Sequence, residues 1–137
     1  MIRQCLKNKF IFYPGPMERI KILYVDDNPI DLFLFRKIFE DIFDLAFADS
    51  VDRAIAYIEN TPSVRVVVTD WQMPVKDGLS LLLHVHKFHP GIFCTMLSDR
   101  SDIGELKPYL KSGVIRKYFR KPLERERFLK EIISLVG

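Results

Sequence analysis

The sequence predicts a single α/β domain in which a parallel sheet is covered by helices on both faces. From residue 20 onward, short apolar runs alternate five times with amphipathic segments, and apolar residues make up most of each run. Strands that are apolar on both sides must be buried on both faces, which is typical of parallel sheets. The chain of 137 residues has the length of one domain with a substantial core.

Five short apolar runs are the strand candidates. Valine, isoleucine, leucine and phenylalanine dominate them, and polar or turn-forming residues bound them. In chain order they are residues 20–25, 45–48, 64–68, 92–97 and 114–119.

Helical periodicity fills the first three intervals between these strands. The segment 29–42 opens with Pro29, which suits a first helical turn, and its apolar residues recur three and four positions apart. Ser50 is the expected N-cap of a second helix over residues 50–60. A third helix is expected over residues 79–88.

The fourth helix is expected to be short. Gly104 and Pro108 fall before the fifth strand, and proline in a helix interior removes a hydrogen bond and causes a clash. We therefore expect the ordered helix to begin near Lys107, with Pro108 in its first turn and Gly113 past its end. A final helix is expected over residues 125–136.

The net charge of +3 is concentrated at the start of the chain. The first 16 residues hold three basic side chains and no acidic one, so the remaining 18 basic residues balance all 18 acidic ones. A neutral domain gives no electrostatic reason to expect nucleic-acid binding. The first segment contains a Pro-Gly-Pro turn and does not resemble a signal peptide. We predict that residues 1–16 form an extension or linker and that residues 17–137 form the domain.

Cysteine use and hydropathy favour a cytoplasmic protein. Cys5 and Cys94 lie far apart without metal or redox spacing, and Cys94 belongs to an apolar strand candidate. No apolar run approaches the roughly 18 residues that cross a bilayer, so no membrane association is expected.

Polar residues follow four of the five strand candidates. Asp26 and Asp27 end the first strand, Asp70 ends the third, Ser98 ends the fourth, and Lys121 comes shortly after the fifth. In doubly wound sheets, ligands bind at the carboxyl ends of the strands, where the strand order reverses. We therefore expect these five residues to converge at that edge of the sheet.

Three converging carboxylates would repel one another and raise their pKa values. Mg²⁺ (or Mn²⁺) relieves this repulsion, because such ions bind carboxylate oxygens, water and phosphate. Lys121 adds a second cation, and Ser98 adds a hydroxyl for a phosphoryl oxygen. The set predicts transfer of a phosphoryl group onto Asp70, a nucleophile held at the end of a rigid strand.

The stretches YVDDNP, VVVTDWQMPVKDG, TMLSD and FRKP together resemble the receiver domain of two-component response regulators. The resemblance runs from about residue 19 to the end of the chain. It implies a flavodoxin-like, doubly wound sheet of five parallel strands in the order 2-1-3-4-5, with helices on both faces. It also implies a phosphoprotein that receives its phosphoryl group from a histidine kinase or a histidine phosphotransfer protein.

The resemblance assigns further roles at the site. Asp70 would accept the phosphoryl group, and the backbone carbonyl of Gln72 would complete the metal ligands. Ser98 and Tyr118 would be switch residues: Ser98 would move toward the phosphate and Tyr118 would move inward. The Lys121–Pro122 bond would be cis.

Four positions are expected to affect the chemistry. Ser98 stands where the family more often has threonine, which keeps the hydroxyl but loosens its rotamer. Asp99 stands where the family has a small residue, so a fourth carboxylate would narrow the pocket or repel the phosphodonor. Gln72 and Arg100 occupy positions at which the family tunes dephosphorylation.

The segment 107–130 carries nine basic and two acidic residues. It forms either an ordinary solvated surface or a basic signalling face, built from the fourth helix, the fifth strand and the final helix, for an output domain or protein partner. The sequence leaves this choice and the formation of a homodimer open.

Two further features of the sequence invite functional interpretations. His84, His86 and His89 lie close together, but at helical spacing only His86 and His89 share a face, so a histidine metal site is not favoured. Trp71 is expected to be a partly packed rim residue and a fluorescence reporter.

Two other functions share features with this predicted site. Haloacid-dehalogenase-type phosphotransferases also use an aspartate at a strand end, but they carry a second aspartate where this chain has Gln72, and a cap. A degenerate receiver that serves only as a dimerisation module is disfavoured by the intact acidic site. The favoured protein is not an enzyme in its own right, since it catalyses only its own phosphoryl transfer and dephosphorylation.

Overall fold

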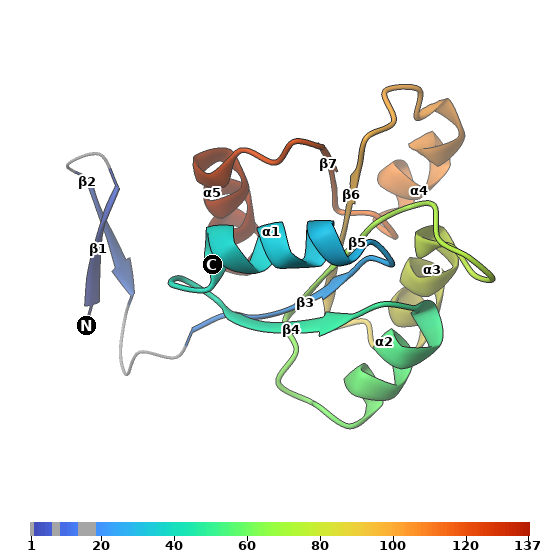
Figure 1. The fold of residues 1–137 in the computed structure, drawn as a ribbon, viewed down its shortest axis with the longest axis horizontal. Helices are drawn as coiled ribbons and strands as arrows, with labels where there is room; N and C mark the ends of the chain where they lie inside the picture. The colour runs from blue at the N-terminus through green and yellow to red at the C-terminus, as the bar shows by residue number, and fades with distance from the viewer. Residues whose placement is uncertain (1, 7–8, 14–18) are drawn as a thin grey trace.

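The computed structural model describes residues 2–6 and 9–13, as backbone only, and residues 19–137. Within residues 19–137, strands and helices alternate as the sequence predicts (Figure 1). The strands are β3 (Lys21–Val25), β4 (Asp44–Ala48), β5 (Val66–Thr69), β6 (Phe93–Ser98) and β7 (Lys117–Arg120).

Five α-helices connect or follow these strands in the described part of the chain. A short 3-10 turn at Gly104–Leu106 leads directly into the fourth of them. The helices are α1 (Pro29–Phe39), α2 (Val51–Glu59), α3 (Gly78–Phe88), α4 (Lys107–Ser112) and α5 (Arg125–Val136).

The five strands form one parallel sheet in the order β4-β3-β5-β6-β7. Counted along the domain this is 2-1-3-4-5, so the predicted order is confirmed. The order reverses at β3, whose Ile22 pairs with Leu45 of β4 on one side and with Val66 of β5 on the other. The carboxyl ends of β3 and β5 therefore flank the crevice in which such sheets bind ligands.

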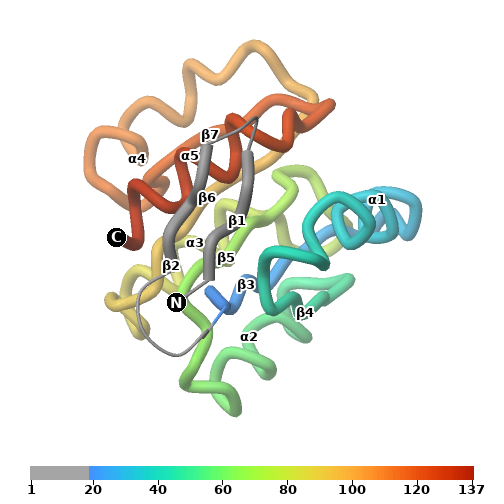
Figure 2. Tube along the Cα trace, turned by 90° about the vertical axis from the view of Figure 1, so that its left-hand side faces the viewer, coloured from blue at the N-terminus to red at the C-terminus, as the bar shows by residue number. Residues whose placement is uncertain are grey.

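Helices cover both faces of the sheet. Figure 2 shows α1 and α5 on one side of the strands and α2, α3 and α4 on the other. Side chains of β3 alternate between two buried clusters: Ile22 and Tyr24 join the α1–α5 cluster, whereas Leu23 and Val25 join the α2–α3 cluster. The inner strands β3, β5 and β6 are mostly apolar because both of their sides are buried.

The predicted helix ends are largely confirmed. Ser50 accepts a hydrogen bond from the backbone N–H of Arg53 (3.2 Å) as the N-cap of α2. Helix α4 begins at Lys107 and stops at Gly113, whose φ of 87° lies in the left-handed region that glycine favours.

Helix α1 is shorter than predicted. It ends at Phe39, because the N–H groups of Ile42 and Phe43 both bond the Phe39 carbonyl (3.0 Å each) in a turn. This turn carries the Ile42 and Phe43 side chains into the core before β4 begins. An apolar pattern that continues past Phe39 therefore reflects burial of the turn rather than more helix.

The start of the chain contains a separate two-stranded antiparallel sheet, β1 (Ile2–Leu6) and β2 (Lys9–Tyr13), in which Ile2 pairs with Tyr13. The predicted extension therefore contains paired strands that the sequence reading did not anticipate. The Pro-Gly-Pro turn expected at residues 14–16 lies outside the described residues, and the boundary at residue 17 stays a prediction. In the described part of the chain, no helix is long and apolar enough to cross a membrane.

Candidate functional site

Backbone hydrogen bonds hold two aspartates at the carboxyl edge of the sheet. The N–H of Asp70 donates to the Val25 carbonyl (2.8 Å), and the N–H of Asp26 donates to the Ala48 carbonyl (3.1 Å). The sheet ladders thus continue one residue beyond β3 and β5. The backbone from which each of the two carboxylates extends is therefore fixed. Oxygens of Asp26, Asp27 and Asp70 lie within 4.8 Å of one another.

Lys121 reaches this cluster from beyond the end of β7. Its Nζ lies 3.0 Å from Asp26 Oδ2 and 3.6 Å from Asp70 Oδ1. The Lys121 N–H donates to the Ser98 carbonyl (2.9 Å), which continues the β6–β7 ladder to the lysine. The Lys121–Pro122 bond is cis, as predicted.

Asp31 is a member of the cluster that sequence reasoning missed. Its Oδ2 lies 2.9 Å from Lys121 Nζ, the shortest of the lysine's three carboxylate contacts. Asp31 lies in the first turn of α1, where Asn28 caps the helix by accepting hydrogen bonds from the N–H groups of Ile30 and Asp31. The available signal was an acidic residue in the first turn of a helix that starts at the same edge of the sheet as Asp26.

Burial and neighbouring charges shift the pKa values of Asp70, Lys121 and Tyr24. Burial, followed by the charge of Asp26, raises the pKa of Asp70 to about 6, although Lys121 opposes the shift. Burial alone would lower the pKa of Lys121, but hydrogen bonds to Asp31 and Asp26 outweigh it, so the pKa rises and the lysine stays charged. Burial and the Asp26 charge also raise the pKa of Tyr24, whose hydroxyl donates to Asp26 Oδ2 (2.6 Å).

The residues present fit a hard divalent cation. The four carboxylates of Asp26, Asp27, Asp31 and Asp70 carry a formal −4 and Lys121 carries +1, which leaves −3 for a cation to reduce. Clustered carboxylate oxygens are the ligands that Mg²⁺ prefers. Gln72 follows in the loop after Asp70 with an exposed side chain, and the role of its carbonyl stays a prediction.

The loop between β5 and α3 closes tightly over the Asp70 backbone. A Cβ on Gly78 would lie 1.9 Å from the Asp70 carbonyl oxygen, and the Gly78 N–H donates to the Trp71 carbonyl (2.7 Å). At the loop tip, the Lys76 N–H donates to the Pro74 carbonyl (2.8 Å) across Val75, which has a φ of 70°. This is a γ-turn, which is strained for a β-branched residue.

Ser98 and Asp99 lie at the end of β6. Ser98 is buried, and its hydroxyl accepts a 3.4 Å hydrogen bond from the Arg100 N–H. Asp99 is exposed and lines a pocket of about 450 Å³ together with Lys121 and Asp31. The pocket therefore adjoins the acidic cluster.

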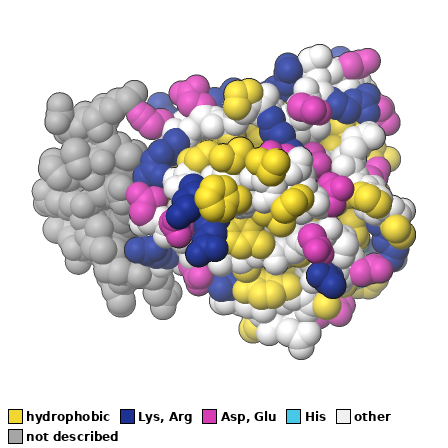
Figure 3. Space-filling view, viewed as in Figure 1, with side chains coloured by type: hydrophobic (Ala, Val, Ile, Leu, Met, Phe, Trp, Pro, Cys, Tyr) yellow, Lys and Arg dark blue, Asp and Glu magenta, His cyan; other side chains and the backbone are white. Residues whose placement is uncertain are grey.

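The same pocket extends along the apolar side of α1, where Leu34 lines it. Ile30, Phe33 and Leu34 are 67%, 55% and 48% exposed. Figure 3 shows apolar side chains gathered over α1 on this face of the molecule. An apolar surface thus lies next to the acidic cluster.

Arg100 links Tyr118 to Trp71. The half-buried Tyr118 donates its hydroxyl to the Arg100 carbonyl (2.6 Å), and the Arg100 guanidinium carbon lies 4.3 Å from the centre of the Trp71 ring. Trp71 is 1% exposed, so the expectation of a partly packed rim residue is wrong. It packs into the α2–α3 cluster with Arg100 over its ring, which is a contact that residue order does not reveal.

Some of the basic side chains in segment 107–130 are paired with carboxylates and do not belong to an open basic surface. Lys117 pairs with Glu131 (2.8 Å), Arg125 pairs with Asp41 (3.0 Å), and Lys121 lies in the acidic cluster. The remaining basic side chains of the segment are exposed; they are Lys107, Lys111, Arg116, Arg120, Arg127 and Lys130.

Comparisons with known proteins agree with this geometry. The sequence profile of the response regulator receiver domain matches residues 22–133. The chemotaxis protein CheY of Halobacterium salinarum is 29% identical over 107 residues, which cover 74% of this chain and 88% of that protein. The transcriptional regulatory protein MalR of Bacillus subtilis is 28% identical over 111 residues. The matched region covers 80% of this chain but only 47% of the length of MalR.

A solved structure supports the fold. The signal receiver domain of an HD domain-containing protein from Pseudomonas fluorescens Pf-5 superposes with a TM-score of 0.81. The superposition covers 92% of this chain and 93% of that chain at 21% identity. At this identity the similarity establishes the fold alone.

Proposed function

Because the chain belongs to the family of response regulator receiver domains, we propose that Asp70 accepts a phosphoryl group from a phosphohistidine. The donor is a histidine kinase or a histidine phosphotransfer protein. The observation that carries this proposal is the position of Asp70. It lies 3.6 Å from Lys121 Nζ and shares a potential metal site with Asp26 and Asp27, at the point where the strand order reverses.

In the proposed step, a carboxylate oxygen of Asp70 attacks phosphorus. The O–P bond forms as the N–P bond of the phosphohistidine breaks, and the electron pair of that bond returns to the imidazole, which takes up a proton. Mg²⁺ held by Asp26, Asp27, Asp70 and the Gln72 carbonyl would neutralise charge on the phosphoryl oxygens. Lys121 would donate a hydrogen bond to one of them.

Lys121 must change partners for this to happen. In the unphosphorylated protein its ammonium group is shared among Asp31, Asp26 and Asp70. A phosphoryl group on Asp70 adds negative charge within reach of the lysine and competes with Asp31 for it. Lys121 would therefore balance the carboxylates before phosphorylation and bind a phosphoryl oxygen on Asp70 after it.

The signal would leave the site through Ser98 and Arg100. Movement of the Ser98 hydroxyl toward the phosphate would break its contact with the Arg100 N–H. The carbonyl of the same Arg100 accepts the Tyr118 hydroxyl, so a shift of this backbone would reach Tyr118. Inward movement of Tyr118 would then repack the face formed by α4, β7 and α5.

That face is the proposed output surface. Its exposed basic side chains fit an acidic surface on an output domain, a separate protein or a second receiver. The apolar residues exposed on α1 lie beside the acidic cluster, where a protein phosphodonor must approach. Asp99, Gln72 and Arg100 are proposed to modulate the rates of phosphorylation and dephosphorylation. The signalling is proposed to occur in the cytoplasm.

The test is phosphate uptake with Mg²⁺ and acetyl phosphate, and Trp71 fluorescence with Mg²⁺ and beryllofluoride. The wild type should take up one phosphate and change its fluorescence, because Arg100 lies over the Trp71 ring. Asp70→Asn should do neither, whereas the control Glu124→Gln, which alters an exposed glutamate directly before α5, should behave as wild type. Stoichiometric uptake by Asp70→Asn would show that another residue is the acceptor.

A further inference from the structure

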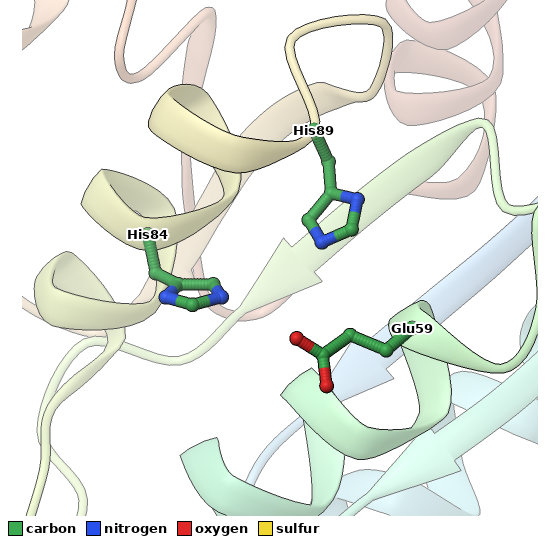
Figure 4. Close-up of side chains that lie close together, drawn as sticks. All are labelled: Glu59, His84 and His89. Carbon is green, nitrogen blue, oxygen red and sulfur yellow. The ribbon is translucent and has the colours of Figure 1, made fainter.

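A second cluster of metal-ligating side chains lies where α2 and α3 end. Glu59 is the last residue of α2, His84 lies within α3, and His89 directly follows α3. One ligand atom from each lies within 4.8 Å of the others. Figure 4 shows the Glu59 carboxylate directed toward the two imidazole rings.

This cluster is separate from the acidic one. Helix α3 begins at Gly78, beside the Asp70 backbone, and runs back along the sheet before His89. Helix α2 likewise ends at Glu59, before the chain enters β5 from its amino end. The second cluster therefore lies toward the edge of the sheet at which the strands begin.

The turn after α3 brings the histidines together. His89 leaves helical geometry (φ −136°, ψ 62°), and its N–H still donates to the Val85 carbonyl (2.7 Å). Its ring centre thereby comes within 6.2 Å of that of His84. Helical spacing pairs His86 with His89, and that expectation is wrong for this reason: His86 is exposed and is not part of the cluster.

One nitrogen atom of the cluster is buried without a hydrogen-bond partner in the described structure. His84 Nε2 is buried, and within the part of the chain that the structure describes it has no hydrogen-bond partner. Buried polar atoms are nearly always paired, because leaving one unpaired costs free energy. Phe88 packs against the His84 ring at 4.8 Å between ring centres.

We propose that Glu59, His84 and His89 bind a divalent transition-metal ion of the Zn²⁺ type. Two imidazole nitrogens and one carboxylate are a common Zn²⁺ ligand set, with a fourth position for water or an external ligand. Mg²⁺ fits poorly, because it prefers an all-oxygen octahedral shell. The molecule would thus carry two cation sites of different selectivity, oxygen-rich at one edge of the sheet and nitrogen-rich toward the other.

The cluster needs only a small contraction to bind such an ion. Ligand atoms about 2.1 Å from a tetrahedral Zn²⁺ are about 3.4 Å apart. The three ligand atoms already lie within 4.8 Å of one another, and the Glu59 side chain can rotate toward the two imidazoles because this residue is exposed. The bound ion would tie the end of α2 to α3.

The test uses the chain of 137 residues after chelator treatment, with millimolar Mg²⁺ present to occupy the acidic cluster. Titration with Co²⁺, followed by visible absorption, should show one equivalent of tight binding. Zn²⁺ should displace the Co²⁺. At a hundredfold excess over Kd, Zn²⁺ should raise Tm by roughly 5–15 °C.

Variants assign the ligands. Glu59→Gln and His89→Ala should each weaken Co²⁺ binding by more than about 100-fold, since a ligand contributes more than the outer groups around it. His84→Ala should do the same, with circular dichroism checking its fold. His86→Ala is the matched control on the same helix and should bind as wild type. Unchanged binding in Glu59→Gln and His89→Ala, or equal loss in His86→Ala, would overturn the assignment.

Asp70→Asn separates this proposal from the proposed phosphoryl chemistry. That variant should keep the Co²⁺ band and the Zn²⁺-dependent rise in Tm, because Asp70 belongs to the other cluster. Loss of the Co²⁺ band in Asp70→Asn would place the ion in the acidic cluster and overturn the second site.

Discussion

The acidic cluster and the Glu59–His84–His89 cluster differ in what holds their side chains. Asp26 and Asp70 extend sheet ladders whose hydrogen bonds fix each backbone position, and Lys121 extends a third. Glu59 and His89 lie at helix ends, and the turn after α3 decides whether His89 meets His84. Strand ends therefore preset the geometry of a site, whereas helix ends leave it to a local turn.

Replacing a glycine by alanine should change the unfolding free energy much more at the carboxyl edge of the sheet than at the edge where the strands begin. In Gly78→Ala the new Cβ would meet the backbone oxygen of Asp70 at 1.9 Å, so we expect a loss of about 3–5 kcal/mol in unfolding free energy. Gly91→Ala, in the turn after His89, meets nothing within 4 Å and should change stability by no more than about 0.5 kcal/mol. Urea unfolding of both variants measures the two changes in free energy. Equal losses would contradict the claim that the backbone is packed more tightly at Asp70 than in the turn after His89.

Lys121→Ala should affect the acidic edge next most strongly. Without metal, loss of the only cation shared by Asp26, Asp31 and Asp70 in the described structure should destabilise the fold by about 2–4 kcal/mol. Mg²⁺ should nevertheless bind more tightly, because its competitor for the carboxylates is gone.

Thermal unfolding and Mg²⁺ titration by Trp71 fluorescence test both expectations for Lys121. Lys111→Ala, at an exposed position of α4, is the control and should leave both quantities unchanged. Weaker Mg²⁺ binding in Lys121→Ala would mean that the lysine organises the carboxylates instead of competing for them.

The pH dependence of stability should distinguish Asp70 from an ordinary aspartate. Its pKa of about 6 in the folded protein exceeds the value of about 3.9 in an unfolded chain. The metal-free folded state therefore binds more protons between these values, and its stability falls as pH rises from about 4 to 6. Asp70→Asn removes this loss and should be more stable by about 1–3 kcal/mol above pH 7, with a smaller difference below pH 4.

Chemical unfolding in chelator at several pH values provides the measurement for Asp70. Millimolar Mg²⁺ should shrink the advantage of Asp70→Asn, because the ion stabilises the wild-type carboxylates. Glu124→Gln is the exposed control. A gain for Asp70→Asn that did not depend on pH would contradict the proposed electrostatic cause.

The smallest predicted effect concerns the loop over Asp70. Val75 is fully exposed with a φ of 70°, so Val75→Gly should stabilise the protein by about 1 kcal/mol through relief of backbone strain. Val75→Ala keeps much of the strain and should gain less than half as much. Tm measured by calorimetry tests the pair, and a loss of stability in Val75→Gly would show that the loop tolerates valine without strain.

Much of the fold could be predicted because burial and helix ends each require particular residue types at neighbouring positions in the sequence. Strands buried on both faces appear as apolar runs, and Ser50 and Gly113 mark helix ends through capping and left-handed geometry. The end of α1 and the strands β1 and β2 were missed. In α1 the apolar pattern continued into a buried turn at Ile42 and Phe43, which periodicity does not distinguish from helix.

The sequence by itself determined the parallel arrangement of the strands, and with it the meeting of Asp26, Asp27, Asp70 and Lys121, because parallel strands deliver their following residues to one edge. The strand order followed from the resemblance to receiver domains. Only the tertiary structure decided that Asp31 shares Lys121 and that Arg100 covers Trp71. It also decided that His84, rather than His86, lies beside His89. These contacts depend on how turns and helix ends direct single side chains across the space between elements, and neither spacing nor hydropathy along the chain encodes that direction.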